Sequence, residues 1–197
     1  MPQQSKSTSN VVRIIGGQWR SRKLHFKDIP DLRPTPDRVR ETVFNWLQPV
    51  IVGARCLDTF AGSGALGFEA LSRGAAHCLF IDKHPQSIAD IQYNLALLKT
   101  DAGETMTGDS LQILHHLHES PKDRRFDVIF IDPPYAMNCA LQCCQLLVEY
   151  QWLANEAYIY LESATAIDEQ QLPEHWKLHR QKKAGNVHYH LAIQQKP

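Results

Sequence analysis

A glycine-rich segment between two apolar runs constrains the fold of this chain more than any other feature. Residues 55–60 predict a buried strand, residues 61–67 fit the pattern G-x-G-x-x-G, and a helical stretch follows over residues 68–72. The next apolar run, residues 77–82, ends in an acid 20 residues after Gly62. Glycines let the backbone turn sharply beside a ligand, and an acid at this spacing is placed to bind ribose hydroxyls. The segment therefore predicts a parallel α/β sheet that binds a nucleoside cofactor.

A second apolar run ends in an unusual loop. Residues 126–131 are rich in Val, Ile and Phe, and Asp132, Pro133, Pro134 and Tyr135 follow them directly. Because proline cannot continue a strand, the run predicts a buried strand with a rigid loop at its carboxyl end, where open α/β sheets keep their active sites. The acid and a proline carbonyl are acceptors and the tyrosine is a flat face, so the loop favours a pocket for a planar group with an NH2. From this motif alone, an ordinary strand-ending turn is an equally good interpretation.

The rest of the chain completes one α/β domain. With 197 residues and 43% hydrophobic content, it can bury one core. Strand and helix patterns alternate, and two late strands are joined at Gly185 and Asn186. This alternation predicts a doubly wound, mostly parallel sheet of seven strands with one antiparallel strand. Besides those above, strands are expected over residues 104–107, 157–162, 176–183 and 186–194, and helices over 85–99, 110–118 and 138–150.

The N-terminal part predicts three segments. Residues 1–10 are polar and are expected to be a disordered tail. Residues 11–15 and 18–26 predict a β-hairpin that turns at Gly16 and Gly17. Thr35 as N-cap and Pro36 at the first helical position then predict a helix that ends at Pro49. The expected organisation is a tail (1–10), a hairpin and helix that form a plausible platform for a nucleic-acid backbone (11–50) and the main domain (51–197).

Charge is distributed unevenly along the chain. Residues 1–40 contain nine Lys or Arg and three Asp, a balance of +6, although the net charge of the whole chain is zero. A basic N-terminal segment on an otherwise acidic chain predicts that one face of the protein binds phosphate. The alternative is a basic segment that is only solvated. The candidate residues for contact with a nucleic-acid substrate are Arg20, Arg22, Lys23, Arg33, Thr35, Arg38 and Arg40.

Other features narrow the class of protein. No apolar run approaches the roughly 18 residues of a membrane span, and the polar start has no signal-peptide pattern, so we expect a cytoplasmic protein. Five cysteines without a C-x-x-C pair predict reduced thiols, mostly in the core. Cys139 and Cys143 are interpreted as core residues, and His115, His116 and His118 as exposed. No metal site is expected.

Several motifs together resemble a known family. Residues 57–64, the acids Asp82 and Asp109, and residues 132–135 resemble the successive motifs of S-adenosylmethionine-dependent amino methyltransferases. Residues 33–41 and 67–75, with Gly16, Gly17 and Arg20, resemble the RsmD family, and the resemblance covers nearly all of residues 11–194. That family methylates the N2 amine of guanine 966 in bacterial 16S ribosomal RNA. The resemblance implies a Rossmann-like class I methyltransferase, S-adenosylmethionine as cofactor, and 16S rRNA of the small subunit or its assembly intermediate as partner.

The resemblance also implies roles for particular residues. The segment 58–64 would wrap the methionine part of the cofactor, Asp82 would hold its ribose, Asp109 would lie near its adenine, and residues 132–135 would receive the target base. From the residues alone, Asp109 is equally well an N-cap. The candidate cofactor-binding residues are Asp58, Phe60, Ala61, Gly62, Ser63, Gly64, Asp82, Lys83, Asp109 and Ser110, and the candidate catalytic residues are Asp132, Pro133, Pro134 and Tyr135.

Four other functions compete with this one. The Asp132 motif indicates an amine acceptor without selecting the base, so a DNA adenine-N6 methyltransferase would use the same pocket. Such enzymes usually carry a target-recognition domain, for which 197 residues leave no room. The basic N-terminal segment disfavours a protein-glutamine methyltransferase, and a nicotinamide-dependent oxidoreductase leaves residues 132–135 unexplained. A non-catalytic RNA-binding module would fail to bind the cofactor. We expect a monomer.

Overall fold

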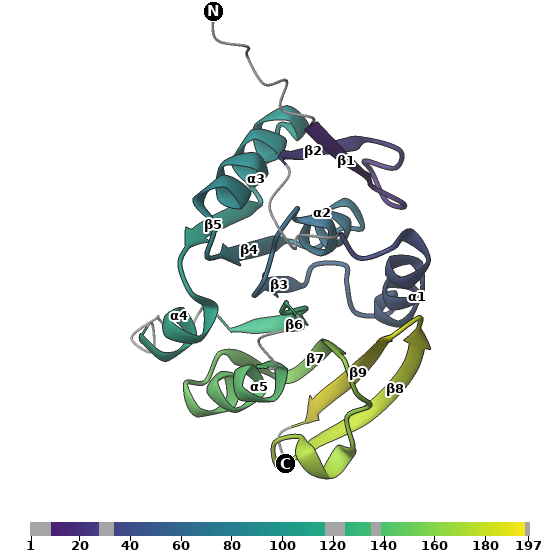
Figure 1. The fold of residues 1–197 in the computed structure, drawn as a ribbon, viewed down its shortest axis with the longest axis vertical. Coiled ribbons are helices and arrows are strands. Elements are labelled where there is room, and N and C mark those ends of the chain that lie inside the picture. The colour runs from purple at the N-terminus through teal and green to yellow at the C-terminus, as the bar shows by residue number, and fades with distance from the viewer. Residues whose placement is uncertain (1–8, 28–33, 117–124, 135–138, 196–197) are drawn as a thin grey trace, which may run out of the picture.

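Seven strands form the central sheet of the protein (Figure 1). The structure is a computed structural model, and it describes residues 9–27, 34–116, 125–134 and 139–195. The strand order follows from short βα units that wind outward in two directions from β3. Across the sheet the strands are β5 (Gly103–Thr107), β4 (His77–Asp82), β3 (Arg55–Asp58), β6 (Phe126–Ile131), β7 (Leu153–Ser163), β9 (Val187–Gln195) and β8 (Trp176–Ala184).

The strand directions confirm the predicted topology. From β5 to β7 all neighbouring strands pair in parallel, whereas β9 pairs antiparallel with both β7 and β8. Among these seven strands β9 alone runs in the opposite direction. The chain reverses its direction of winding between β3 and β6, which is the point where open α/β sheets form their ligand crevice.

Helices cover both faces of the sheet (Figure 1). One face carries α1 (Asp37–Leu47), α2 (Ala65–Ser72) and α3 (Pro85–Leu98), and the other carries α4 (Ser110–His116) and α5 (Ala140–Glu149). Two hydrophobic clusters fill the layers, one on each side of the strands. The N-terminal extension predicted over residues 11–50 contributes Val12, Leu24 and Phe44 to the first cluster, so it shares a core with the sheet.

The N-terminal hairpin differs from its prediction in two ways. Its strands are β1 (Ser9–Arg13) and β2 (Lys23–Lys27), so the first strand begins two residues before the predicted start at Val11. The predicted tight turn at Gly16 and Gly17 is wrong, because a long loop joins the strands. This loop docks on the end of α2, where the Ser72 hydroxyl donates to the Gly16 carbonyl at 2.6 Å. Gly17 has a φ of +75°, and a Cβ there would lie 1.8 Å from the Ser72 carbonyl oxygen.

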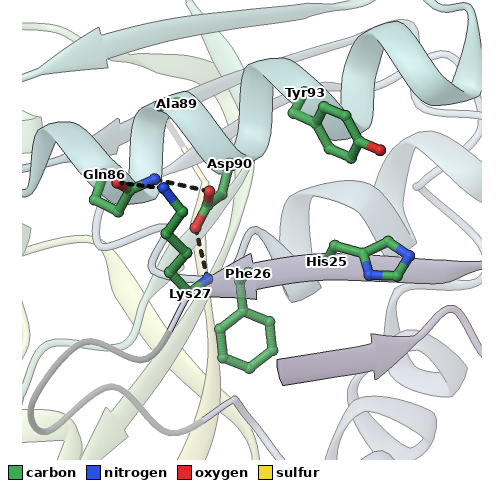
Figure 2. Close-up of a pocket in the computed structure, with 7 residues that line it drawn as sticks. All are labelled: His25, Phe26, Lys27, Gln86, Ala89, Asp90 and Tyr93. Carbon is green, nitrogen blue, oxygen red and sulfur yellow. Dashed lines mark hydrogen bonds between the residues drawn. The ribbon is translucent and has the colours of Figure 1, made fainter. Parts of the chain in front are cut away.

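The hairpin is fastened to α3. The side chain of Asn94, which is fully buried, accepts from the His25 amide at 3.0 Å and donates to the His25 carbonyl at 2.8 Å. The Lys27 amide donates to Asp90 at 2.7 Å, and the Lys27 ammonium donates to Gln86 at 3.1 Å (Figure 2). These bonds cross a hollow of about 450 Å³ between β2 and α3. Its polar groups hold the hairpin in place, and its lining residues are His25, Phe26, Lys27, Gln86, Ala89, Asp90 and Tyr93.

The cysteine prediction is confirmed, since all five cysteines are buried free thiols. His115 and His116 are exposed, as predicted, whereas His118 lies outside the described residues. Within the described ranges, no helix is long and apolar enough to cross a membrane.

Candidate active site

Acids gather along one edge of the sheet. One acid ends β3, another ends β4, a third lies two residues beyond β5, and a fourth directly follows β6. Because these four strands are parallel neighbours, their carboxyl ends share one edge, as the sequence predicted. The four acids are Asp58, Asp82, Asp109 and Asp132.

Asp82 ties the glycine-rich loop to the end of β4. One of its carboxylate oxygens accepts from the Gly62 amide and the other from the His84 amide, both at 2.8 Å. Each oxygen keeps a further lone pair for a ligand hydroxyl. At Gly64 the backbone is left-handed with a φ of +76°, and a Cβ would lie 2.7 Å from the Phe68 ring. Only glycine therefore lets the loop pack this closely against α2.

Asp58 is a buried acid whose negative charge is balanced by few partners. Its side chain is 2% exposed, and one carboxylate oxygen accepts from the Gly67 amide at 3.1 Å. Burial raises the pKa of Asp58 to about 7, the Gly67 hydrogen bond opposes this rise, and the charge of Asp82 adds to it. A positively charged ligand group beside Asp58 would balance the negative charge that the protein itself leaves unbalanced.

Two predicted cofactor residues also have structural partners. Asp109 caps α4, because its carboxylate accepts from the Gln112 amide at 3.1 Å. The Ser110 hydroxyl donates to the Thr59 carbonyl, and the Thr59 hydroxyl donates to the Phe130 carbonyl at 2.8 Å. These bonds brace the ends of β3 and β6 against the start of α4. The roles of Asp109 and Ser110 toward a cofactor stay predictions.

The remaining predicted cofactor residues surround the same loop. Ala61 and Ser63 are buried, Phe60 is half-buried against the cluster beneath α4 and α5, and Lys83 is exposed just beyond β4.

The loop after β6 presents Asp132 at the point where the sheet winding reverses. Its carboxylate accepts from the Thr35 hydroxyl at 3.1 Å. Burial and the neighbouring acid Glu162 raise the pKa of Asp132 well above its usual value, and the Thr35 hydrogen bond opposes the shift. Pro133 is buried and Pro134 is exposed. Tyr135 lies outside the described residues, so its predicted stacking role stays a prediction.

Two residues predicted to contact RNA are part of the protein interior. Thr35 is 7% exposed and bonds to Asp132, so it is not the N-cap of α1, whose cap position is Pro36. Arg40 is fully buried, and it donates to the Thr35 carbonyl at 3.2 Å, to the Arg13 carbonyl at 2.8 Å and to Asp37 at 2.6 Å. Both side chains brace the site from inside, which corrects their assignment to the RNA-facing surface.

The other basic candidates lie on the surface. Arg20 and Arg22 are exposed on the hairpin loop, Lys23 is exposed at the start of β2, and Arg38 is exposed in the first turn of α1. Arg33 lies outside the described residues. Contact of these residues with RNA stays a prediction.

Sequence reasoning missed one acid of the site. Glu162 lies near the carboxyl end of β7, the parallel neighbour of β6, and is 4% exposed. The Tyr160 hydroxyl donates to its carboxylate at 2.5 Å. The signal was an acid at the end of a fifth apolar strand, the same signal that identified the other four acids. In the described part of the chain, no group of three or more His, Cys, Asp or Glu side chains is arranged to hold a metal ion.

Comparisons with known proteins bear on the whole chain. The family model described as "Conserved hypothetical protein 95" matches residues 12–193. The chain is 46% identical over 191 residues to "Ribosomal RNA small subunit methyltransferase D" of Escherichia coli strain K12, covering 97% of this chain and 94% of the relative.

Solved structures agree with this match. The structure of yhhF from Escherichia coli superposes with a TM-score of 0.83 at 44% identity and covers 95% of this chain and 100% of that chain. The structure of SMU.776 complexed with SAH shares the fold, with a TM-score of 0.71 at 12% identity, covering 98% of this chain and 57% of that chain. The fold is thus that of the Rossmann-like methyltransferases. By both the family match and the similarity to methyltransferase D over nearly its full length, the chain belongs to the RsmD family.

Proposed function

We propose that this chain transfers a methyl group from S-adenosylmethionine to the exocyclic N2 amine of a guanine, guanine 966, in 16S ribosomal RNA of the small subunit. The family match and the fold show that the chain is an S-adenosylmethionine-dependent methyltransferase. The name of the Escherichia coli relative gives small-subunit ribosomal RNA as the target of that protein. The observation that carries the proposal is Asp132, an acceptor held at the sheet reversal beside the expected cofactor loop.

The acids beside the glycine-rich loop fit the cofactor. Asp82 keeps lone pairs for the two ribose hydroxyls, and Asp58 is a buried carboxyl that a positively charged amino group would compensate. The methionine part of S-adenosylmethionine carries such an amino group. The cofactor supplies a methyl group on a positively charged sulfur, so the protein has no need to form a covalent intermediate. The protein must align the target amine and exclude water.

Asp132 and the Pro133 carbonyl would act on the target amine. The amine of guanine is a poor nucleophile because its lone pair is delocalised into the ring. Acceptors outside the ring plane favour a pyramidal nitrogen and stabilise the positive charge that grows there during transfer. Once methylated, the nitrogen loses one proton to Asp132 or to water, which leaves a neutral secondary amine. This role requires Asp132 to be ionised when the amine is bound.

The exposed basic residues provide a surface for the RNA backbone. Arg20, Arg22 and Lys23 lie on the hairpin, and Arg38 lies on α1, the helix that follows the Asp132-binding residue Thr35. RNA targets of this kind present unstacked bases in loops or bases flipped into a pocket. A chain of this size has little surface to read a long sequence, so we expect it to recognise a folded region of the ribosomal subunit.

The nature of the modified nucleoside tests the proposal. The protein is incubated with radiolabelled S-adenosylmethionine and small subunits from cells that lack this gene, and the RNA is digested and separated. The expected product is N2-methylguanosine at one position. Label in N6-methyladenosine would favour the adenine enzyme instead, and cofactor binding without transfer to either small subunits or duplex DNA would contradict methyl transfer to a nucleobase.

A further inference from the structure

Buried and half-buried hydrogen bonds surround Asp132 and its neighbour Glu162. Arg40 donates to the Thr35 carbonyl at 3.2 Å, and the Thr35 hydroxyl donates to Asp132 at 3.1 Å. On the other side Asp132 lies beside Glu162, because the register of β6 and β7 pairs Ile131 with Leu161 and each acid directly follows one of these residues. The charge of Glu162 raises the pKa of Asp132. Glu162 in turn accepts from the Tyr160 hydroxyl at 2.5 Å. The chemistry proposed above uses Asp132 but assigns nothing to Glu162 or Tyr160.

The two acids are neighbours at the ends of β6 and β7, and Glu162 has little contact with water. Glu162 is 4% exposed and Tyr160 is fully buried. Two ionised carboxylates side by side repel each other, and a proton held between them replaces this repulsion with a hydrogen bond. The pair is therefore expected to bind one proton jointly over a wide pH range and to titrate as a unit.

We propose that Glu162 is a positioning residue for the methyl transfer: it shares one proton with Asp132 and, held by Tyr160, fixes the Asp132 carboxylate toward the target amine. The inference rests on the proposed role of Asp132. In this arrangement Thr35 and the shared proton take up lone pairs of Asp132 on the protein side. The lone pairs that remain face the place of the base.

The groups around Asp132 and Glu162 favour a state in which the two acids hold one proton between them. Asp58 approaches from the end of β3 and adds negative charge, so it disfavours ionisation of both acids together. Tyr189 on β9 pairs with Glu162 across the strands, and it contributes to the raised pKa of Tyr160. The Arg40 guanidinium of α1 donates to the Thr35 carbonyl, and at its other end it contacts Glu69 at 3.5 Å. Burial and these acids raise the pKa of Tyr160, so its hydroxyl stays a donor.

Two substitutions at Glu162 separate positioning from simple packing. Glu162→Gln keeps an NH2 that donates to Asp132 and a carbonyl that accepts from Tyr160, whereas Glu162→Ala removes both. We expect Glu162→Ala to lower kcat roughly 10- to 100-fold, with the Kd for S-adenosylmethionine unchanged. Glu162→Gln should recover kcat to within about threefold of the wild type.

The pH profile gives a readout that packing would not move. In the wild type the two acids titrate together, so kcat should rise when the pair loses its first proton and fall when it loses the shared one. In Glu162→Gln one carboxyl is left, and its neutral neighbour no longer raises the pKa of Asp132. The profile should then show a single rise and no fall at higher pH. This measurement decides the inference even if Glu162→Ala fails to fold.

Glu162→Gln would overturn the inference if its kcat fell as far as that of Glu162→Ala, or if its profile kept the wild-type position and shape. Asp132→Asn, assayed in parallel, separates this failure from a failure of the proposed function. Full turnover in Asp132→Asn would remove the proposed function itself. Loss of turnover in Asp132→Asn, with every Glu162 variant at the wild-type rate and profile, would remove only the role of Glu162.

Discussion

Two acids near α1 have opposite surroundings. Glu69, which is fully buried, accepts from the amides of Ile15 and Gly16 at 2.8 Å each, and it pairs with Arg73 at 2.7 Å and Arg40 at 3.5 Å. Asp132 instead has a hydroxyl and a second acid as partners, and its pKa is raised. A buried carboxylate with cations and amides around it holds a structure together, whereas one without such compensation is poised to meet a ligand. The comparison predicts that Glu69 governs folding and Asp132 governs the reaction.

The largest expected effect is on stability at Glu69. Glu69→Ala leaves two arginines and two loop amides without their shared acceptor, and breaking a buried ion pair in this way costs about 3–5 kcal/mol. The free energy of unfolding, measured in urea, should fall by that amount. The matched control Glu41→Ala removes an exposed acid of α1 and should change it little. A decrease for Glu69→Ala no larger than that for Glu41→Ala would contradict the structural role of Glu69.

The next effect is on the rate at Asp132. Removing one charge-stabilising group from an active site typically costs about 2.7–4 kcal/mol, or 10²–10³ in kcat. We expect Asp132→Ala to lose methyl transfer by this factor, in an assay with tritiated cofactor. Calorimetry should show nearly intact cofactor binding. Asp127→Asn is the control, since Asp127 lies at the opposite end of β6 and accepts from the Arg55 amide at 2.8 Å. Normal turnover of Asp132→Ala would rule out its role.

Asp58, beside the glycine-rich loop, is a third acid to compare with Glu69 and Asp132. Its pKa rises from 3.8 to about 7 on folding, so the folded state binds the proton more tightly than the unfolded chain. The ionised group therefore lowers stability at pH above 7, and this cost disappears as pH falls toward 4. Asp58→Asn, which keeps an acceptor for the Gly67 amide, should stabilise the free protein at pH 8 by on the order of 2–4 kcal/mol.

The same substitution should weaken binding of S-adenosylmethionine, because Asn offers no charge to its amino group. Urea unfolding of both proteins between pH 4 and 8 measures the first effect, and calorimetry the second. If Asp58→Asn were less stable than the wild type at pH 8, Asp58 would belong with Glu69 as a structural acid.

The outer surface gives the smallest effect. Replacing Arg20, Arg22, Lys23 and Arg38 with Gln should weaken RNA binding and reduce the slope of log affinity against log salt by about 0.7 for each phosphate that is no longer neutralised. The control replaces four exposed basic residues of β8, at the far edge of the sheet (Figure 1): Lys177, Arg180, Lys182 and Lys183. Equal slopes for the two variants would show that the hairpin face is not the RNA surface.

The sheet and its row of acids were predictable because their signals are local. Each strand is a short apolar run, and each acid follows its strand within two residues, so the parallel topology alone brings Asp58, Asp82 and Asp132 to one edge. Glu162 carried the same signal. Its place beside Asp132 depends on the register between β6 and β7, which no local pattern reveals.

The N-terminal predictions failed where distant residues override local preference. Gly16 and Gly17 suggested a tight turn, but Glu69, 53 residues beyond Gly16, captures the loop amides and draws the loop onto α2. Thr35 before Pro36 had the sequence of an N-cap, but its hydroxyl bonds to Asp132, 97 residues away. Arg40 belongs to a basic cluster in the sequence. It is nevertheless buried, because its guanidinium donates to the Thr35 carbonyl and to Asp37.

The most direct test is a crystal structure of this protein with bound S-adenosylmethionine. The amino group should lie against Asp58 and the ribose on Asp82, and the methyl group should point toward Asp132 with room for one flat base between them. A methyl group directed away from Asp132, or separated from it by more than a base can span, would contradict the account.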